Sequence, residues 1–174
     1  MIERVVSGGQ TGVDRGALDA ALVAGVACGG WCPKARRAED GMIPAKYPLK
    51  EMPSADYRQR TLRNVQDSDA TLILMTGKLS GGTALTRSFA LAEAKPLMLI
   101  DLDRPLSPES VLHWATKQGI RVLNVAGPRE SLRPGIQQRA EKFVAQMLAV
   151  CRAAARGCAT ESQHGHPDED FSDD

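Results

Sequence analysis

The chain alternates short apolar runs with longer stretches in which apolar residues recur at helical spacing. The run at 70–75 is continuously apolar, which is typical of a strand that is covered on both faces. Strands are predicted at 4–7, 26–31, 70–75, 95–101 and 121–127, and we expect 95–101 to be buried as well. Helices are predicted at 12–24, at 54–69, from the turn at 76–83 to about residue 94, at 107–119 and at 134–156. The last helix has a stripe that we expect to face the core: Ile136, Ala140, Phe143, Val144, Met147, Leu148 and Cys151.

Helices that separate successive strands predict the fold class. They indicate an α/β protein with right-handed βαβ units and a parallel sheet with helices on both faces, a three-layer sandwich. We expect one domain over residues 1–156. Ligands of such sheets bind beyond the carboxyl ends of the strands. The loops that follow the predicted strands are 7–12, 29–44, 76–83, 101–106 and 126–133.

The segment 32–56 contains proline, glycine and charged residues and shows no clear period. A structureless stretch of this length inside a compact domain is uncommon and is often functional.

Composition changes this picture little. Hydrophobic residues make up 43% and charged residues 25% of 174 residues, as in ordinary soluble proteins. No apolar run approaches the roughly 20 residues that span a bilayer, and the N-terminus lacks the apolar core of a signal peptide. We therefore expect a cytoplasmic protein without a membrane partner.

Cys28, Cys32, Cys151 and Cys158 are not spaced like a four-thiolate zinc site, so we expect ordinary thiols and no metal.

The net charge of +1 hides an asymmetry. Residues 157–174 contain six acidic residues and no Lys or Arg, so we expect an acidic, disordered tail. Residues 1–156 then have 22 basic and 15 acidic residues, a net charge of +7. This moderate excess suits a small anionic partner, and it is too small and too dispersed to favour nucleic acid.

A glycine-rich turn follows the first predicted strand and leads into a helix. Glycines there allow a ligand to approach the backbone, and the helix N-terminus favours negative charge. The alternative is a purely structural turn, because the spacing matches neither common phosphate-binding motif. The candidate residues are Gly8, Gly9, Gln10, Thr11, Gly12, Asp14 and Arg15.

A second glycine turn, SGGT, consists of Ser80, Gly81, Gly82 and Thr83 and also joins a strand to a helix. Two such turns on neighbouring strands would direct two helix N-termini into one crevice. Together they predict a pocket for a phosphate or another oxyanion.

Two further groups of residues have two interpretations each. Lys34, Arg36 and Arg37 form either a cationic rim over the crevice or a solvated loop. Arg60, Asn64 and Asp67 share one helix face, which is either a surface group or a shell that supports the pocket.

The sequence offers no recognisable catalytic set. None of the three histidines accompanies an obvious nucleophile, and no pair of carboxylates stands out in the loops after the strands.

Four stretches in this order resemble the molybdenum cofactor carrier protein family: SGGQTGVDRGALDAAL, GGWCPKARRAEDGMIP, RTLRNVQDSDATLIL and SGGTALTRSFA. The resemblance extends from about Ile2 to Val150. The superfamily also contains the lonely guy phosphoribohydrolases and the DNA-processing protein A fold. The resemblance implies a Rossmann-like sheet, a homo-oligomer (dimer or tetramer) and a positively charged pocket for a molybdopterin-like or nucleotide-like anion. It implies molybdenum cofactor as cargo, which the protein carries or protects.

The phosphoribohydrolases have the motif PGGxGTxxE, whose Glu supports N-glycosidic cleavage. Here the stretch is SGGTALTRS, and no Glu follows before Glu93. This favours a carrier over a hydrolase, unless Asp14, Asp40 or Asp69 replaces the missing carboxylate. A sensor of nucleotide derivatives is a third alternative.

Overall fold

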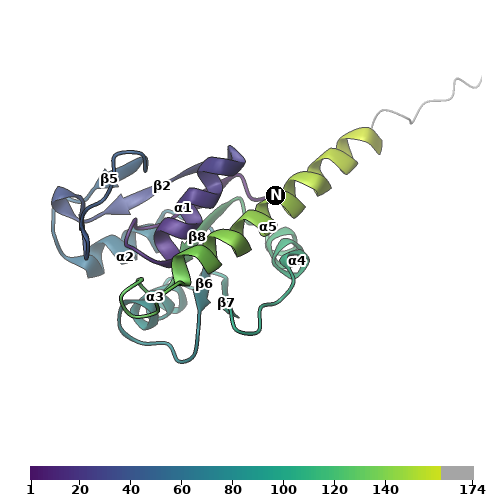
Figure 1. Ribbon diagram of the computed structural model, residues 1–174. Helices are drawn as coiled ribbons and strands as arrows, with labels where there is room; N and C mark the ends of the chain where they lie inside the picture. The colour runs from purple at the N-terminus through teal and green to yellow at the C-terminus, as the bar shows by residue number, and fades with distance from the viewer. Residues whose placement is uncertain (162–174) are drawn as a thin grey trace, which may run out of the picture.

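Within residues 1–161, which the computed structural model describes, six parallel strands form one sheet in the order β5-β2-β1-β8-β6-β7 (Figure 1). The strands are β1 (Arg4–Val6), β2 (Ala27–Cys32), β5 (Leu49–Glu51), β6 (Ala70–Met75), β7 (Leu97–Asp101) and β8 (Val122–Ala126). A hairpin of β3 (Arg37–Ala38) and β4 (Gly41–Met42) lies outside this sheet. The helices are α1 (Val13–Ala24), α2 (Tyr57–Gln66), α3 (Gly81–Ala92), α4 (Pro108–Lys117) and α5 (Ile136–Glu161).

The helices cover both faces of the sheet, which confirms the predicted α/β three-layer fold. Helices α1, α4 and α5 share one hydrophobic core with the sheet, to which β6 contributes Leu72 and Leu74. Helices α2 and α3 pack against each other and contact β2, β6 and β7 on the opposite face. The core on that side includes polar side chains, because Asn124 Nδ2 donates to Thr71 Oγ1 at 3.2 Å between two buried positions.

Most of the predicted elements are confirmed. Strand β6 has the predicted bounds, and every residue of the apolar stripe on α5 is buried. Helix α2 begins after Asp56, whose side chain accepts a hydrogen bond from the N–H of Arg58 at 2.8 Å. Helix α5 extends to Glu161, five residues beyond its predicted end. The rest of the predicted acidic tail, residues 162–174, lies outside the described residues.

Two predictions need correction. The segment 32–56 is not structureless: it contains a 3-10 turn (Lys34–Arg36), the β3–β4 hairpin and β5. Its strands are only two or three residues long, too short to produce a period. Strand β7 is not covered on both faces, because it is the last strand of the sheet and its Leu99 is 37% exposed.

The chain adds strands in opposite directions on the two sides of the sheet centre, which leaves a crevice at the carboxyl ends of β1, β8 and β6. From β1 the chain continues to β2 and β5 on one side, whereas β6 and β7 lie on the other side and β8 fills the space between. A ligand site in a sheet of this kind is expected at the carboxyl ends of these central strands. In the described part of the chain, no helix combines the length and apolar character that crossing a bilayer requires.

We predict that Leu72→Ala lowers the free energy of unfolding by about 2–5 kcal/mol, because Leu72 is completely buried. Leu99→Ala on β7 is the matched control and should cost less than about 1 kcal/mol. Urea unfolding followed by circular dichroism measures both, and equal losses would contradict the assignment of β7 as an exposed edge.

Candidate functional site

A cavity of about 220 Å³ lies at the carboxyl ends of β1, β6 and β8. Its walls come from the loops at 7–12, 76–83 and 126–133 and from the first turns of α1, α2 and α3. Three of the five loops that follow predicted strands therefore meet at one place. The loops at 29–44 and 101–106 contribute no lining residue.

Most of the charged side chains that line the cavity are positive. Arg60 comes from α2, Lys78 from the loop after β6, and Arg129 and Arg133 from the loop after β8. Among the described lining residues, the one carboxylate is Asp14. This balance favours an anion in the cavity.

The second glycine turn has open space beside its backbone. A Cβ atom added to Gly81 or Gly82 would meet no atom within 4 Å. Ser80 is the N-cap of α3, and its side chain makes no capping hydrogen bond. The first N–H groups of a helix have no intrahelical acceptor. Those of α3 therefore remain available to an anion at the wall of the cavity.

The glycines of the first turn are packed against the protein itself. Gly12 has φ of 79°, and a Cβ atom there would collide with the carbonyl oxygen of Pro128. A Cβ atom on Gly9 would collide with Leu49, and one on Gly8 with the guanidinium of Arg60. These glycines allow close packing of protein groups rather than leaving space for a ligand.

The backbone N–H groups of the first turn are also engaged within the protein. The N–H of Val13 donates to the carbonyl of Pro128 at 3.2 Å. The N–H of Thr11 donates to Gln10 Oε1 at 3.0 Å. The N–H of Gln10 donates to Asp14 Oδ2 at 3.3 Å. The acceptors of these three N–H groups are thus groups of the protein itself, among them the carboxylate of Asp14.

Asp14 is buried, and burial raises the pKa of its carboxyl above the usual 3.8. The charge of Arg60 and hydrogen bonds from Gln10, Ser7 and Gly8 act in the opposite direction without cancelling this effect. A buried acid with a raised pKa beside a cavity is a common feature of functional sites.

Arg60 lies between Asp14 and the cavity. Its Nη1 is 3.4 Å from Asp14 Oδ2, and the two side chains are only 12% and 6% exposed. Its Nε is buried and has no hydrogen-bond partner among the described residues. Arg60 therefore retains donor capacity that its contacts in the protein do not use.

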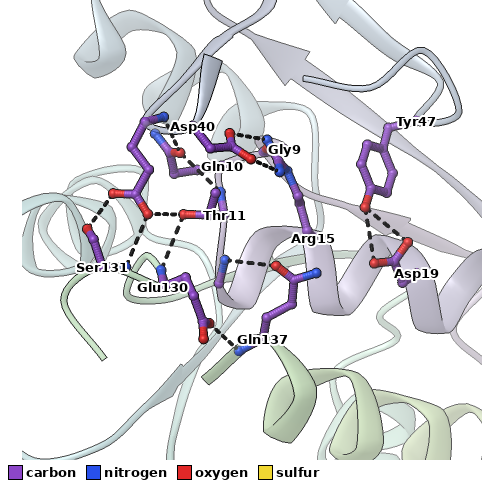
Figure 2. A network of polar contacts seen from close by, with 12 residues as sticks. Gly9, Gln10, Thr11, Arg15, Asp19, Asp40, Tyr47, Glu130, Ser131 and Gln137 are labelled. Atoms are coloured by element: carbon purple, nitrogen blue, oxygen red, sulfur yellow. Dashed lines mark hydrogen bonds and ion pairs between the residues drawn. The ribbon is translucent and has the colours of Figure 1, made fainter. Parts of the chain in front are cut away.

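Arg15 lies on the other side of the first glycine turn. Its Nη1 and Nη2 donate to the carboxylate of Asp40 at 2.5 and 2.8 Å, and its Nε donates to the carbonyl of Gly9 at 3.2 Å (Figure 2). Together with Glu39, Asp40 and Glu130 it lines a more open depression of about 490 Å³. Negative side chains dominate this depression, so it suits an anion less well than the smaller cavity.

Glu39 joins the hairpin to the loops of the cavity. Its carboxylate accepts from the hydroxyl of Thr11, and from the N–H and hydroxyl of Ser131 at 3.1 and 2.5 Å (Figure 2). Its own N–H donates to Gln10 Oε1 at 2.9 Å. Burial alone would raise the pKa of Glu39. The hydrogen bonds and the charge of Arg129 outweigh this effect and lower the pKa. Its carboxylate therefore holds together the loops after β1 and β8.

Glu130 occupies the N-terminus of α5. Its carboxylate accepts from the N–H of Gly135 and, at 2.9 Å, from that of Gln137. The first turn of α5 is therefore capped by a carboxylate of the chain itself, whereas α3 has no side-chain cap.

The three cations at 34–37 lie away from the cavity. Lys34 and Arg37 are exposed. Arg36 instead orders its own loop, because its guanidinium donates to backbone carbonyls at 3.0–3.3 Å. The acceptors are Ile43, Pro44, Tyr47 and Leu49.

The α2 face that contains Arg60, Asn64 and Asp67 points toward the sheet. Asn64 exchanges hydrogen bonds with the backbone of Trp31, and Asp67 Oδ2 accepts from Trp31 Nε1 at 2.7 Å. These contacts attach α2 to β2, and of the three residues Arg60 alone lines the cavity.

Sequence reasoning missed several cavity residues, namely Tyr57, Lys78, Arg129, Leu132 and Arg133. Their position in the chain could have indicated three of them, because Lys78, Arg129 and Arg133 lie in the loops 76–83 and 126–133 after central strands. No pattern within these loops distinguishes a cation that lines a cavity from a solvated one.

We predict that replacing Gly12 and Gly82 by alanine affects stability very differently. Gly12→Ala should lower the free energy of unfolding by at least about 2 kcal/mol, because the backbone conformation and the contact with Pro128 both exclude a Cβ. Gly82→Ala should change it by less than about 1 kcal/mol, since the added methyl meets open space. Urea unfolding of both variants measures this. A destabilised Gly82→Ala would show that the second turn is packed as closely as the first.

The comparisons with known proteins agree with this architecture. Residues 5–148 match the model of the circularly permutated YpsA SLOG family. A crystal structure at 1.45 Å resolution from Syntrophus aciditrophicus SB, named "Putative molybdenum carrier protein", is 47% identical with a TM-score of 0.80. The match covers 84% of this chain and 95% of that chain. A search of curated proteins finds no match. The resemblance in the four sequence stretches is thus confirmed, and the chain belongs to the circularly permutated YpsA SLOG family.

Proposed function

We propose that this protein binds an anionic ligand in the 220 Å³ cavity and carries or protects it without transforming it. The observation that carries the proposal is the uncapped N-terminus of α3, which lies among four cations beside open space at Gly81 and Gly82. Free N–H groups, a helix dipole and cationic side chains are the usual components of phosphate and oxyanion sites.

The cargo that we propose is molybdenum cofactor, which has a terminal phosphate, a flat pterin and an oxo-metal centre. The name of the Syntrophus protein supports molybdenum as part of the cargo. The described cavity lining contains no Cys or His. Its residues would therefore hold the phosphate and oxo groups through hydrogen bonds and charge, not by coordinating the metal.

The size of the cavity limits how much of the ligand it encloses. Sites for drug-sized ligands usually measure about 300–1,000 Å³, and this cavity is smaller. We propose that the phosphate lies at Ser80–Thr83 and that the remainder of the ligand extends toward Tyr57 and Leu132 at the walls.

We predict that the purified protein retains molybdenum cofactor through gel filtration, as measured by metal content and by pterin fluorescence after oxidation. Arg60→Gln and Lys78→Gln should each weaken retention by roughly ten- to a hundredfold, the usual loss for a hydrogen bond to a charged group. Arg37→Gln removes the same charge outside the cavity and serves as the control. Loss of retention in Arg37→Gln alone would place the ligand at the 34–37 rim instead.

One observation favours a second function, hydrolysis of a nucleotide N-glycosidic bond. Of the three carboxylates that could replace the missing Glu, only Asp14 lines the cavity. Asp40 pairs with Arg15, and Asp69 accepts from the N–H groups of Arg121 and Val122. The raised pKa of Asp14 suits a proton donor or acceptor.

Under this second function, nucleoside monophosphates should release free base, and Asp14→Asn should abolish the release while Asp40→Asn leaves it intact. Chromatography of the products measures the reaction. No release from any member of a nucleotide panel would exclude hydrolysis and leave the carrier function.

A further inference from the structure

Asp14 and Arg60 form a charged pair in the wall of the cavity, and each depends on the other. Arg60 Nη1 lies 3.4 Å from Asp14 Oδ2, and the guanidinium lies so close over Gly8 that a Cβ atom there would force it to shift. The guanidinium also lies 5.9 Å from the ring centre of Tyr57. Arg60 is therefore placed beside the cavity by contacts with the first glycine turn and with its own helix.

The contact with Asp14 leaves part of the hydrogen-bonding capacity of the Arg60 guanidinium unused. The distance to Asp14 is long for a charge-assisted hydrogen bond, which usually measures about 2.7–2.9 Å. The buried Nε has no partner among the described residues. An anion in the cavity would offer Arg60 closer acceptors than Asp14 does.

Within residues 1–161, Arg60 is the one cation that forms an ion pair with Asp14. Arg15, its neighbour on α1, pairs with Asp40 on the opposite side of the turn. From the other walls, Lys78 in the loop after β6 and Arg129 and Arg133 in the loop after β8 face the same cavity. They would themselves be drawn to an entering anion. The hydrogen bonds that also stabilise the Asp14 carboxylate come from the neutral groups of Ser7, Gly8 and Gln10.

We infer that Asp14 is a positioning residue, which holds Arg60 in the free protein and takes up a proton when an anion draws Arg60 away. The inference rests on the proposed anion site. Once its counterion is withdrawn, a carboxylate buried among neutral groups is stable only in the protonated form. The proton comes from solvent and adds to the carboxylate, and no other bond is made or broken. Binding therefore strengthens as pH falls, by up to about tenfold per pH unit for one whole proton.

Sulfate is a suitable probe, because it remains a dianion from about pH 5 to about pH 8 and exchanges no proton itself. No histidine lines the described cavity, so this range contains no competing imidazole there. Sulfate is titrated calorimetrically into the full-length protein at constant ionic strength, in two buffers with different enthalpies of ionisation. The difference between the two heats gives the number of protons taken up.

The wild-type protein should take up a fraction of a proton, whereas Asp14→Asn should take up none. This variant should bind sulfate at least as tightly, because no carboxylate competes for Arg60; a purely structural role for Asp14 predicts weaker binding. Arg60→Gln provides a second variant in case Asp14→Asn does not fold. It should bind sulfate more weakly and show no proton uptake, and Arg37→Gln should behave like the wild type.

Two results would overturn the inference alone: sulfate binding without proton uptake, or equal uptake by the wild type and Asp14→Asn. Failure of the wild-type protein to bind sulfate would overturn the proposed anion site together with it.

Discussion

Helices α1, α3 and α5 follow the three loops that form the cavity walls, and the unpaired N–H groups of their first turns need acceptors. At α1 the acceptors include the carbonyls of Pro128 and Gln10, and at α5 the carboxylate of Glu130 accepts from the N–H of Gln137. At α3 the described structure supplies no side-chain acceptor. The proposed ligand site follows from this difference, because of these three helices α3 combines uncapped donors with open space beside them.

The acceptors at α1 and α5 also hold the walls of the cavity together. Because Pro128 contacts the start of α1, the loop after β8 lies directly against the first glycine turn. Glu39 and Glu130 fix the same loop from the hairpin and from α5. The carboxylates of these loops are therefore engaged in contacts within the protein, whereas the cations Arg60, Lys78, Arg129 and Arg133 line the cavity.

The first glycine motif consequently has a structural role that its sequence does not reveal. Its glycines admit Arg60, Leu49 and Pro128 to close contact, and its N–H groups are engaged within the chain. The shorter and less specific SGGT turn has the open backbone. The length of the first motif matches its many packing contacts, whereas binding a ligand requires fewer specific residues.

By itself, the sequence determined the order of helices and strands, the parallel sheet with helices on both faces, and the loops among which a site had to lie. Periodicity is sufficient for this, because apolar stripes and runs follow directly from which faces are buried. Periodicity could not show β5 or the β3–β4 hairpin, because these strands are too short to produce a period.

Only the tertiary structure decided which polar groups meet. Arg15 and Arg60 look alike in the sequence, yet one pairs with Asp40 behind the turn and the other faces the cavity. Charge pairing depends on distances across folded loops, and these are set by packing.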